Sequence, residues 1–342
     1  MKKYLLAAII AVLIAVAVAT SWRSEELPVE HSNAPQLTAI EPNRTLPQQS
    51  QALASPADKN HHSSTPNTSE DFVTSWFDQV RTSDHPKDLL LAALLSKNDP
   101  ADKEAFLSRA YETMPDDLLL NYAIADFCGH NTHASLCAMV NPHRLIELDG
   151  DNGFMWTTVA NQAYRNGDID GAAHYLQQAV GLYRYDSQTS QLLRLIDDSL
   201  VRHGAQRNFE LVSASAGIQA AQTSPSQYQH IAAMCREQPH WQQTCQGLGQ
   251  TMMSQGREVM DIAVGQQLVG EFAPEQELPP LPAEWDEFLK SSESPEQARL
   301  VAVLTAENPP VSDALWHEYL RLYEEDGAPA AFYHLVETLL AI

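Results

Sequence analysis

Residues 154–186 read FMWTTVANQAYRNGDIDGAAHYLQQAVGLYRYD, and this stretch decides the fold. Apolar residues recur at three- and four-residue steps on both sides of Gly167-Asp168, a spacing typical of two amphipathic helices joined by a tight turn. The residues that share one face of the first helix are Trp156, Val159, Ala160 and Ala163. The stretch therefore predicts a helical hairpin that buries this face.

This hairpin resembles a tetratricopeptide repeat. That family has a large residue early in the first helix, a small residue where the two helices touch, a Gly-Asp type turn, and small residues in the second helix. The residues at matching separations, over about 34 positions, are Trp156, Ala160, Gly167-Asp168, Ala172 and Ala179. The resemblance implies a TPR-like α-solenoid whose concave groove binds a protein or peptide.

The rest of the chain carries further helix signals. Four dipeptides place a capping side chain before a proline suited to the first helical position: Asp99-Pro100, Asn141-Pro142, Ser224-Pro225 and Ser294-Pro295. Gln227 and Gln297 complete capping boxes with the two serines. Because no comparable run has a two-residue period, we expect an all-α fold of stacked antiparallel helical hairpins, with degenerate repeats over 99–128 and 208–256.

The first 20 residues predict export. Lys2 and Lys3 precede an uninterrupted apolar run over residues 4–19, and positive flanks stay on the cytoplasmic side of a membrane. The small residues Ala17-Val18-Ala19 favour a signal peptide that is cleaved, whereas Trp22-Arg23 favours a retained transmembrane anchor, so both alternatives stay open. We expect the remainder in the bacterial periplasm, anchored in the inner membrane if the segment is uncleaved.

Composition divides the exported part into three regions. Residues 21–69 are rich in Pro, Ser and Gln and poor in large apolar residues, which predicts a disordered linker. Residues 70–270 form the predicted helical-repeat domain. Residues 271–342 form an acidic C-terminal helical region with 15 acidic and three basic residues, in which helices are expected to begin at Ser294, Ser312 and Ala328.

Four cysteines form two short brackets, Cys128 with Cys137 and Cys235 with Cys245. An even number of cysteines in an exported chain favours two local disulfides. The alternative at the first bracket is zinc, because two thiolates and two imidazoles make a tetrahedral ligand set. That set would be Cys128, His130, His133 and Cys137, although its spacing differs from the common zinc-finger pattern.

No motif assigns a reaction. The helix motif of zinc proteases needs two histidines four residues apart, and in His317-Glu318-Tyr319-Leu320-Arg321 the second is an arginine. The sequence contains neither a Walker loop nor a dinucleotide fingerprint, and Ser213-Ala214-Ser215-Ala216-Gly217 lacks the first glycine of a nucleophile elbow. We therefore assign no catalytic residue, metal or cofactor.

Charge narrows the class of partner. The 342 residues include 21 Lys plus Arg against 44 Asp plus Glu, for a formal net charge of −23. This balance disfavours nucleic acid, because phosphate binding depends on Lys and Arg. The leading hypothesis is a scaffold for a protein or peptide partner. The alternatives are a helical periplasmic enzyme that acts on cell-wall polymer through converging carboxylates, and a purely structural spacer.

The resemblance also places the partner. In similar repeats, another side of the first helix, away from its buried face, lines the concave groove. The residues on that side are Thr157, Asn161, Tyr164 and Arg165, at three- and four-residue steps. An asparagine can bond a peptide backbone and an arginine can pair with a carboxylate, so these four are the predicted partner-binding residues.

Overall fold

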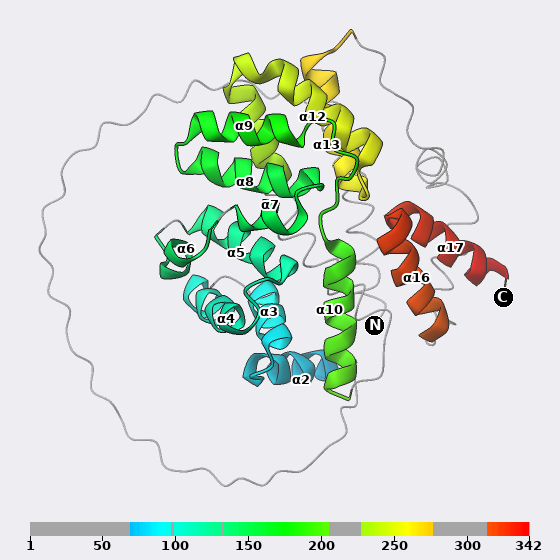
Figure 1. The fold of residues 1–342 in the computed structure, drawn as a ribbon. Helices are drawn as coiled ribbons and strands as arrows, with labels where there is room; N and C mark the ends of the chain where they lie inside the picture. The colour runs from blue at the N-terminus through cyan, green and yellow to red at the C-terminus, as the bar shows by residue number, and fades with distance from the viewer. Residues whose placement is uncertain are drawn as a thin grey trace, which may run out of the picture.

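The computed structural model describes residues 69–96, 99–131, 133–141, 143–204, 227–275 and 313–341, and all regular secondary structure in this part of the chain is helical (Figure 1). The all-α prediction is therefore confirmed. The predicted export segment, nearly all of the predicted linker, and the caps expected at Ser224 and Ser294 lie outside these residues. Among the described helices, none combines the length and the apolar character needed to cross a membrane.

The helices follow one another at short intervals. Those before residue 150 are α2 (Ser69–Thr82), α3 (Pro86–Leu95), α4 (Pro100–Thr113), α5 (Leu118–His130), α6 (Ser135–Met139) and α7 (Arg144–Asp149). Those after it are α8 (Gly153–Arg165), α9 (Ile169–Ala179), α10 (Thr189–Arg202), a helix over residues 227–237, α12 (Gln242–Gln255), α13 (Val259–Phe272), α16 (Asp313–Asp326) and α17 (Ala328–Ala341). The most extensive packing is within consecutive pairs, namely α3 with α4, α8 with α9, α12 with α13 and α16 with α17.

Local capping explains where several helices begin. The carboxylate of Asp99 accepts a hydrogen bond from the backbone amide two residues on, at 2.9 Å, and so starts α4 as predicted. The Asn141-Pro142 signal marks a different feature. The side chain of Asn141 accepts from the amide of His143 at 3.0 Å, which closes a turn, and α7 begins only at Arg144.

The hairpin predicted over 153–186 is present as α8 and α9. Asn152 caps α8 by accepting from the amide of Phe154 at 3.1 Å, and Asp168 caps α9 by accepting from the amide of Gly171 at 2.9 Å. Gly167, in the turn between the two helices, has φ of +81°, a left-handed conformation that glycine adopts without a steric penalty. The local signals in this stretch therefore specify both helices and the turn.

A continuous core runs through the stack. Its largest fully buried side chains include Trp76, Leu107, Ile124, Leu145 and Leu176 from successive helices, and Tyr185 from the extended segment before α10. Phe154 of α8 lies among aromatic rings, with the ring centres of Tyr122, Tyr185 and Tyr228 at 5.5, 5.7 and 6.3 Å. The first half of α8 is therefore enclosed on more than one side.

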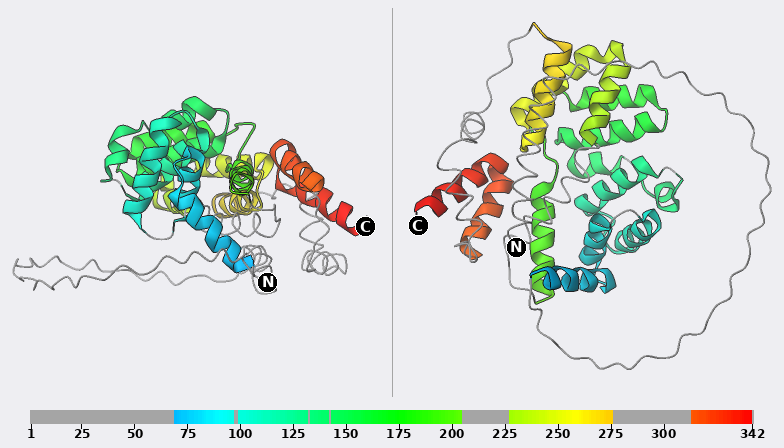
Figure 2. Two further views of the ribbon diagram at one scale, coloured as in Figure 1. Left: turned by 90° about the horizontal axis from the view of Figure 1, so that it is seen from below. Right: turned by 180° about the vertical axis from the view of Figure 1, so that it is seen from behind.

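Helix α10 departs from the hairpin rhythm. It runs along the stack, and seen from below it lies between the stack and the α16–α17 pair (Figures 1 and 2). An extended segment leads into it: the carbonyl of Arg184 accepts from the amide of Gly153 at 2.9 Å, and the amide of Tyr185 donates to the carbonyl of Gln255 at 3.1 Å. The chain thus doubles back across its own stack.

A buried carboxylate, Asp88 of α3, holds the far end of α10, and it is 0% exposed. It accepts hydrogen bonds from the hydroxyl of Ser83 at 2.7 Å and from the hydroxyl of Ser199 at 3.1 Å. It also accepts from Nη2 of Arg202 at 3.1 Å and lies 3.0 Å from Nε2 of His203. Burial raises the pKa of Asp88, but these hydrogen bonds outweigh burial and leave the pKa below its usual value.

Both predicted cysteine pairings are confirmed. The bond between Cys128 and Cys137 joins α5 to α6, and the bond between Cys235 and Cys245 joins helix 227–237 to α12, with Cα atoms 5.5 and 5.9 Å apart. Because the two sulfurs of the first bracket are bonded to each other, the alternative zinc set does not form in this structure. Two such disulfides place the chain in an oxidising, extracytoplasmic compartment.

Candidate functional site at the end of α8

Thr157, one of the four predicted partner-binding residues, is not accessible to a partner. Its side chain is 0% exposed, donates to the carbonyl of Phe154 at 2.9 Å and lies 3.1 Å from the hydroxyl of Tyr185. The reason is tertiary. The segment that doubles back toward α10 brings Tyr185 against this side of α8, so the helix is buried over a wider face than the apolar spacing indicates.

Helix 227–237 covers the next turn of the same side. The side-chain amide of Gln227 donates to the hydroxyl of Thr158 at 2.7 Å. The hydroxyl of Tyr164 donates to the carboxylate of Glu237 at 2.6 Å and accepts from the side-chain amide of Gln238 at 3.3 Å. Tyr164 is therefore engaged by the chain itself, and the surface that remains open lies at the C-terminal end of α8.

Asn161 lies one turn before that end and is half-buried. Its side-chain oxygen is shielded from solvent and has no hydrogen-bond partner among the described residues. Burying a carbonyl oxygen without a donor is unfavourable, so this position has an unused acceptor. Of the four predicted residues, Asn161 therefore has a side-chain oxygen that no donor of the described chain contacts. Arg165 has no carboxylate partner in the same part of the chain.

Arg165 is the last residue of α8 and is exposed. Its Nη1 lies 3.4 Å from Nε2 of His230, a residue of helix 227–237. The ring of His230 is tilted against the ring of His130, with centres 5.8 Å apart, and Nδ1 of His130 donates to the carbonyl of Asp126 at 2.9 Å. Three helices therefore bring an arginine and two histidines together.

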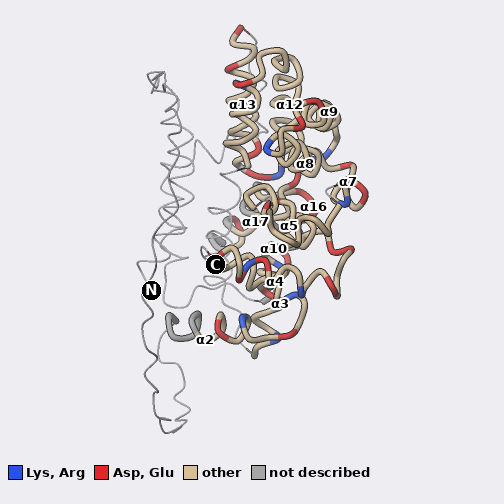
Figure 3. The backbone as a smooth tube through the Cα atoms, turned by 90° about the vertical axis from the view of Figure 1, so that its left-hand side faces the viewer, with Lys and Arg blue, Asp and Glu red and all other residues tan. Residues whose placement is uncertain are grey.

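Arg165 and Lys103 differ from the other cations. Acidic residues outnumber basic ones along the described chain (Figure 3). Every other Lys and Arg of the described residues has a carboxylate oxygen within 3.9 Å. Within the same ranges, no ion pair of this kind involves Arg165 or Lys103. In a chain with many more acids than bases, two cations without carboxylate partners call for an explanation.

Both cations act on one carboxyl group, that of Asp126 in α5. Burial raises the pKa of Asp126, while the charges of His130, Lys103 and Arg165 oppose that rise. Burial also lowers the pKa of His230, and Arg165 and His130 lower it further, which favours a neutral imidazole. We name Lys103, Asp126, His130, Arg165 and His230 the α8-end cluster.

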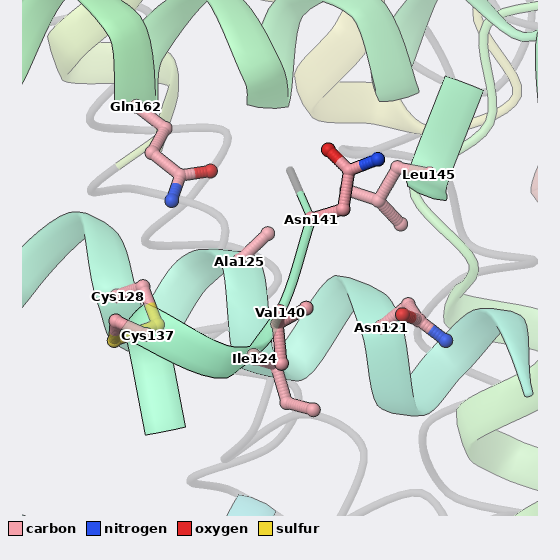
Figure 4. Close-up of a pocket in the computed structure, with 9 residues that line it drawn as sticks. All are labelled: Asn121, Ile124, Ala125, Cys128, Cys137, Val140, Asn141, Leu145 and Gln162. Carbon is pink, nitrogen blue, oxygen red and sulfur yellow. A yellow bond between two sulfur atoms is a disulfide. The ribbon is translucent and has the colours of Figure 1, made fainter. Parts of the chain in front are cut away.

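A small pocket lies between α5, α7 and α8 (Figure 4). It is large enough for about one water molecule, and the Cys128–Cys137 disulfide lines one end. The side-chain oxygens of Asn121 and Gln162 are buried there without a hydrogen-bond partner among the described residues. Because no lining side chain titrates, the pocket suits a small hydrogen-bond donor and offers no acid or base.

Carboxylates do converge elsewhere, as the enzyme alternative requires. Asp261 is 0% exposed, accepts from the hydroxyl of Tyr228, and also accepts from the amide of Glu258 at 3.0 Å. The hydroxyl of Tyr323 lies 2.8 Å from both carboxylate oxygens of Glu258. Burial raises the pKa of both acids, that of Asp261 to about 7. Tyrosine hydroxyls thus cover both carboxylates. The two acids therefore serve to hold helices together.

Sequence analysis missed this pair and His230 of the α8-end cluster, and it considered His130 only as a zinc ligand. The only local signal for the Glu258–Asp261 pair was the acid three residues after Glu258, which is the spacing of a capping box. For His230, no local signal exists, because Arg165 is 65 residues away along the chain. Among the described residues, no three His, Cys, Asp or Glu side chains are arranged to hold a metal ion.

No protein family, no curated protein and no solved structure matches this chain. The tetratricopeptide resemblance accordingly remains a prediction from one hairpin, and function is inferred from the site itself.

Proposed function

We propose that this protein is an exported helical scaffold that binds a protein or peptide partner through the C-terminal end of α8. The observation that carries the proposal is Arg165, an exposed arginine without a carboxylate partner in a described chain where the other arginines all have one. Exposed arginines beside aromatic and amide side chains are enriched at protein interfaces.

Neighbouring groups support the same surface. Tyr164 contributes an aromatic ring, packed at 5.9 Å from the ring of Trp241, and Asn161 contributes an unused acceptor. The two disulfides hold the supporting helices, since one closes α5 onto α6 and the other closes helix 227–237 onto α12. A rigid support lowers the entropic cost of binding a flexible peptide.

We further propose the bacterial periplasm as the location, with residues 1–20 serving as a signal peptide or as an inner-membrane anchor. The disulfides support an oxidising compartment, and the basic start followed by an apolar run supports export. The enzyme alternative has less support, because tyrosines cover Glu258 and Asp261. A purely structural spacer leaves the cations without partners unexplained.

Site-specific photocrosslinking in living cells tests the binding surface. A photoreactive residue at Asn166, which is exposed and follows Arg165, should give a discrete crosslinked product. The same residue at Gln79, exposed on α2, is the control and should not give that product. Combining Asn161→Ala and Arg165→Ala should reduce the product at least tenfold, about 1.4 kcal/mol of binding free energy. An undiminished product in the folded double variant would contradict the proposed surface.

A further inference from the structure

The α8-end cluster contains basic groups from four helices, three of which act on the carboxyl group of Asp126. Lys103 comes from α4, His130 from α5, Arg165 from α8 and His230 from helix 227–237. We propose that Lys103, His130 and Arg165 form a binding site for a carboxylate group of a peptide, with His230 as the positioning residue for Arg165. This inference rests on the proposed function and specifies the chemical group that the scaffold recognises.

Helix dipoles favour the positions of two basic residues of the cluster and disfavour the position of a third. His130 and Arg165 lie in the last turns of α5 and α8, where the partial negative charge of a helix end favours a cation. Lys103 lies in the first turn of α4, where the dipole disfavours a cation. A negative partner would offset this unfavourable placement, and Lys103 makes no ion pair within the described part of the chain.

Asp126 does not fully supply that negative charge. Burial raises its pKa, so the protein disfavours its ionised form even though three basic groups surround it. One carboxylate, even when ionised, balances only one of the two positive charges that Lys103 and Arg165 carry. The cluster therefore keeps at least one positive charge, which a single external carboxylate can balance.

Charge favours a carboxylate over a phosphate group. The guanidinium of Arg165 presents a planar fork that matches two oxygens of either group, so the fork alone does not choose between them. A phosphate group carries up to two negative charges, and two helix C-terminal ends, those of α5 and α8, repel the second charge. Helix N-terminal ends with free amides are the usual phosphate sites, and neither α5 nor α8 presents one here.

His230 orients the arginine. Its Nε2 lies 3.4 Å from Nη1 of Arg165, and its lowered pKa favours a neutral ring, in which Nε2 can accept from the guanidinium. That contact occupies one nitrogen of the guanidinium and leaves its other donors for the ligand. Because His230 touches Arg165 and not the ligand, we assign it a positioning role.

Peptide titration of the full-length mature protein tests the site. Three peptides of the same Gly-Ser composition serve as probes: one with a free C-terminus, one amidated, and one amidated with a central Glu. Binding is followed by the NMR signals of ¹³C-labelled histidine, since His130 and His230 line the site. Peptides are raised to about 20 mM, above the millimolar Kd expected of one carboxylate contact.

We expect both histidine signals to shift with a peptide that carries a carboxylate and not with the fully amidated peptide. A shift with the free C-terminus alone identifies a chain terminus as the ligand, and a shift with the Glu peptide alone identifies an acidic side chain. Arg165→Gln and Lys103→Gln should each weaken binding at least tenfold. Arg236→Gln is the matched control, because Arg236 lies in helix 227–237 but pairs with Glu271 at 2.7 Å.

His230→Ala should weaken binding while leaving the His130 signal responsive to saturating peptide, as expected of a positioning residue. Equal shifts with the amidated peptide, no shift with either carboxylate peptide, or full affinity in both Arg165→Gln and Lys103→Gln would overturn the inference. Crosslinking at Asn166 that survives Lys103→Gln but is lost when Asn161→Ala and Arg165→Ala are combined would leave the scaffold function standing and remove only the carboxylate site.

Discussion

The hydroxyl of Tyr323 lies 2.8 Å from both carboxylate oxygens of Glu258, and this contact joins α16 to the start of α13 across 65 residues of chain. Asp261 follows in the first turn of α13 and bonds Tyr228, so two acids and two tyrosines connect three helices. Arg194 adds a surface ion pair with Glu324 of α16. Protonation of the buried acids therefore bears directly on stability.

We predict that stability falls as the pH rises from 5 to 7. Burial raises the pKa of Asp261 to about 7, against an ordinary value of 3.8. The folded state then holds a proton that the unfolded state has released, so each rise in pH in this window favours unfolding. The loss should be about 2 kcal/mol, measured as the free energy of unfolding in urea.

Asp261→Asn should reduce this pH dependence and leave the part that Glu258 contributes, because the amide cannot ionise while its oxygen can still accept from the backbone amide of Glu258. Asp170→Asn is the control, since Asp170 is an exposed acid of α9 and should leave the slope unchanged. Asp88 does not contribute between pH 5 and 7, because its lowered pKa keeps it ionised there. An unaltered slope in Asp261→Asn would assign the pH dependence to other groups.

We predict that Asp88→Asn destabilises the fold by about 2–3 kcal/mol. The substitution removes the charge that balances Arg202, and it removes an acceptor that Ser199, Arg202 and His203 share. The measurement is the urea midpoint at pH 7, where the carboxylate is ionised in both states.

The matched control for Asp88 is Asp84→Asn. The side chain of Asp84 is 93% exposed and pairs with Arg109 at 2.5 Å on the surface. Because water screens such a pair, its loss should cost less than about 1 kcal/mol. Equal destabilisation by the two substitutions would show that the buried carboxylate has no special role in holding α10.

We predict that each disulfide stabilises the fold by about 2.5–3 kcal/mol, the chain-entropy value for a loop of about ten residues. Replacing both cysteines of one disulfide by serine should lower the melting temperature by several degrees. The two double variants are Cys128→Ser with Cys137→Ser, and Cys235→Ser with Cys245→Ser. Intact mass of periplasmic protein, with and without reductant, counts the bonds directly. Four free thiols in that protein would refute both the pairing and the compartment.

We predict that residues 70–342 lie outside the cytoplasm. Alkaline phosphatase fused after residue 342 should be active, because this reporter needs the oxidising compartment to form its own disulfides. The mass of the mature chain separately decides whether cleavage follows Ala19. An inactive fusion, together with an active cytoplasmic reporter at the same position, would reverse the topology.

The sequence by itself determined the features that depend on near neighbours. The cap at Asp99, the turn at Gly167-Asp168 and the two cysteine pairs each join residues at most ten positions apart. Such contacts follow from the local backbone path, which the capping residues, the glycine and the helical period specify. The all-α class and the α8–α9 hairpin could be predicted for this reason.

Only the tertiary structure decided which surfaces stay open. Thr157 appears on the polar side of its helix, yet Tyr185 buries it from 28 residues away, and His230 reaches Arg165 from 65 residues away. These contacts depend on α10 doubling back and on helix 227–237 crossing α8. A crossing of helices depends on the sum of many weak packing contacts, and no short sequence pattern encodes that sum.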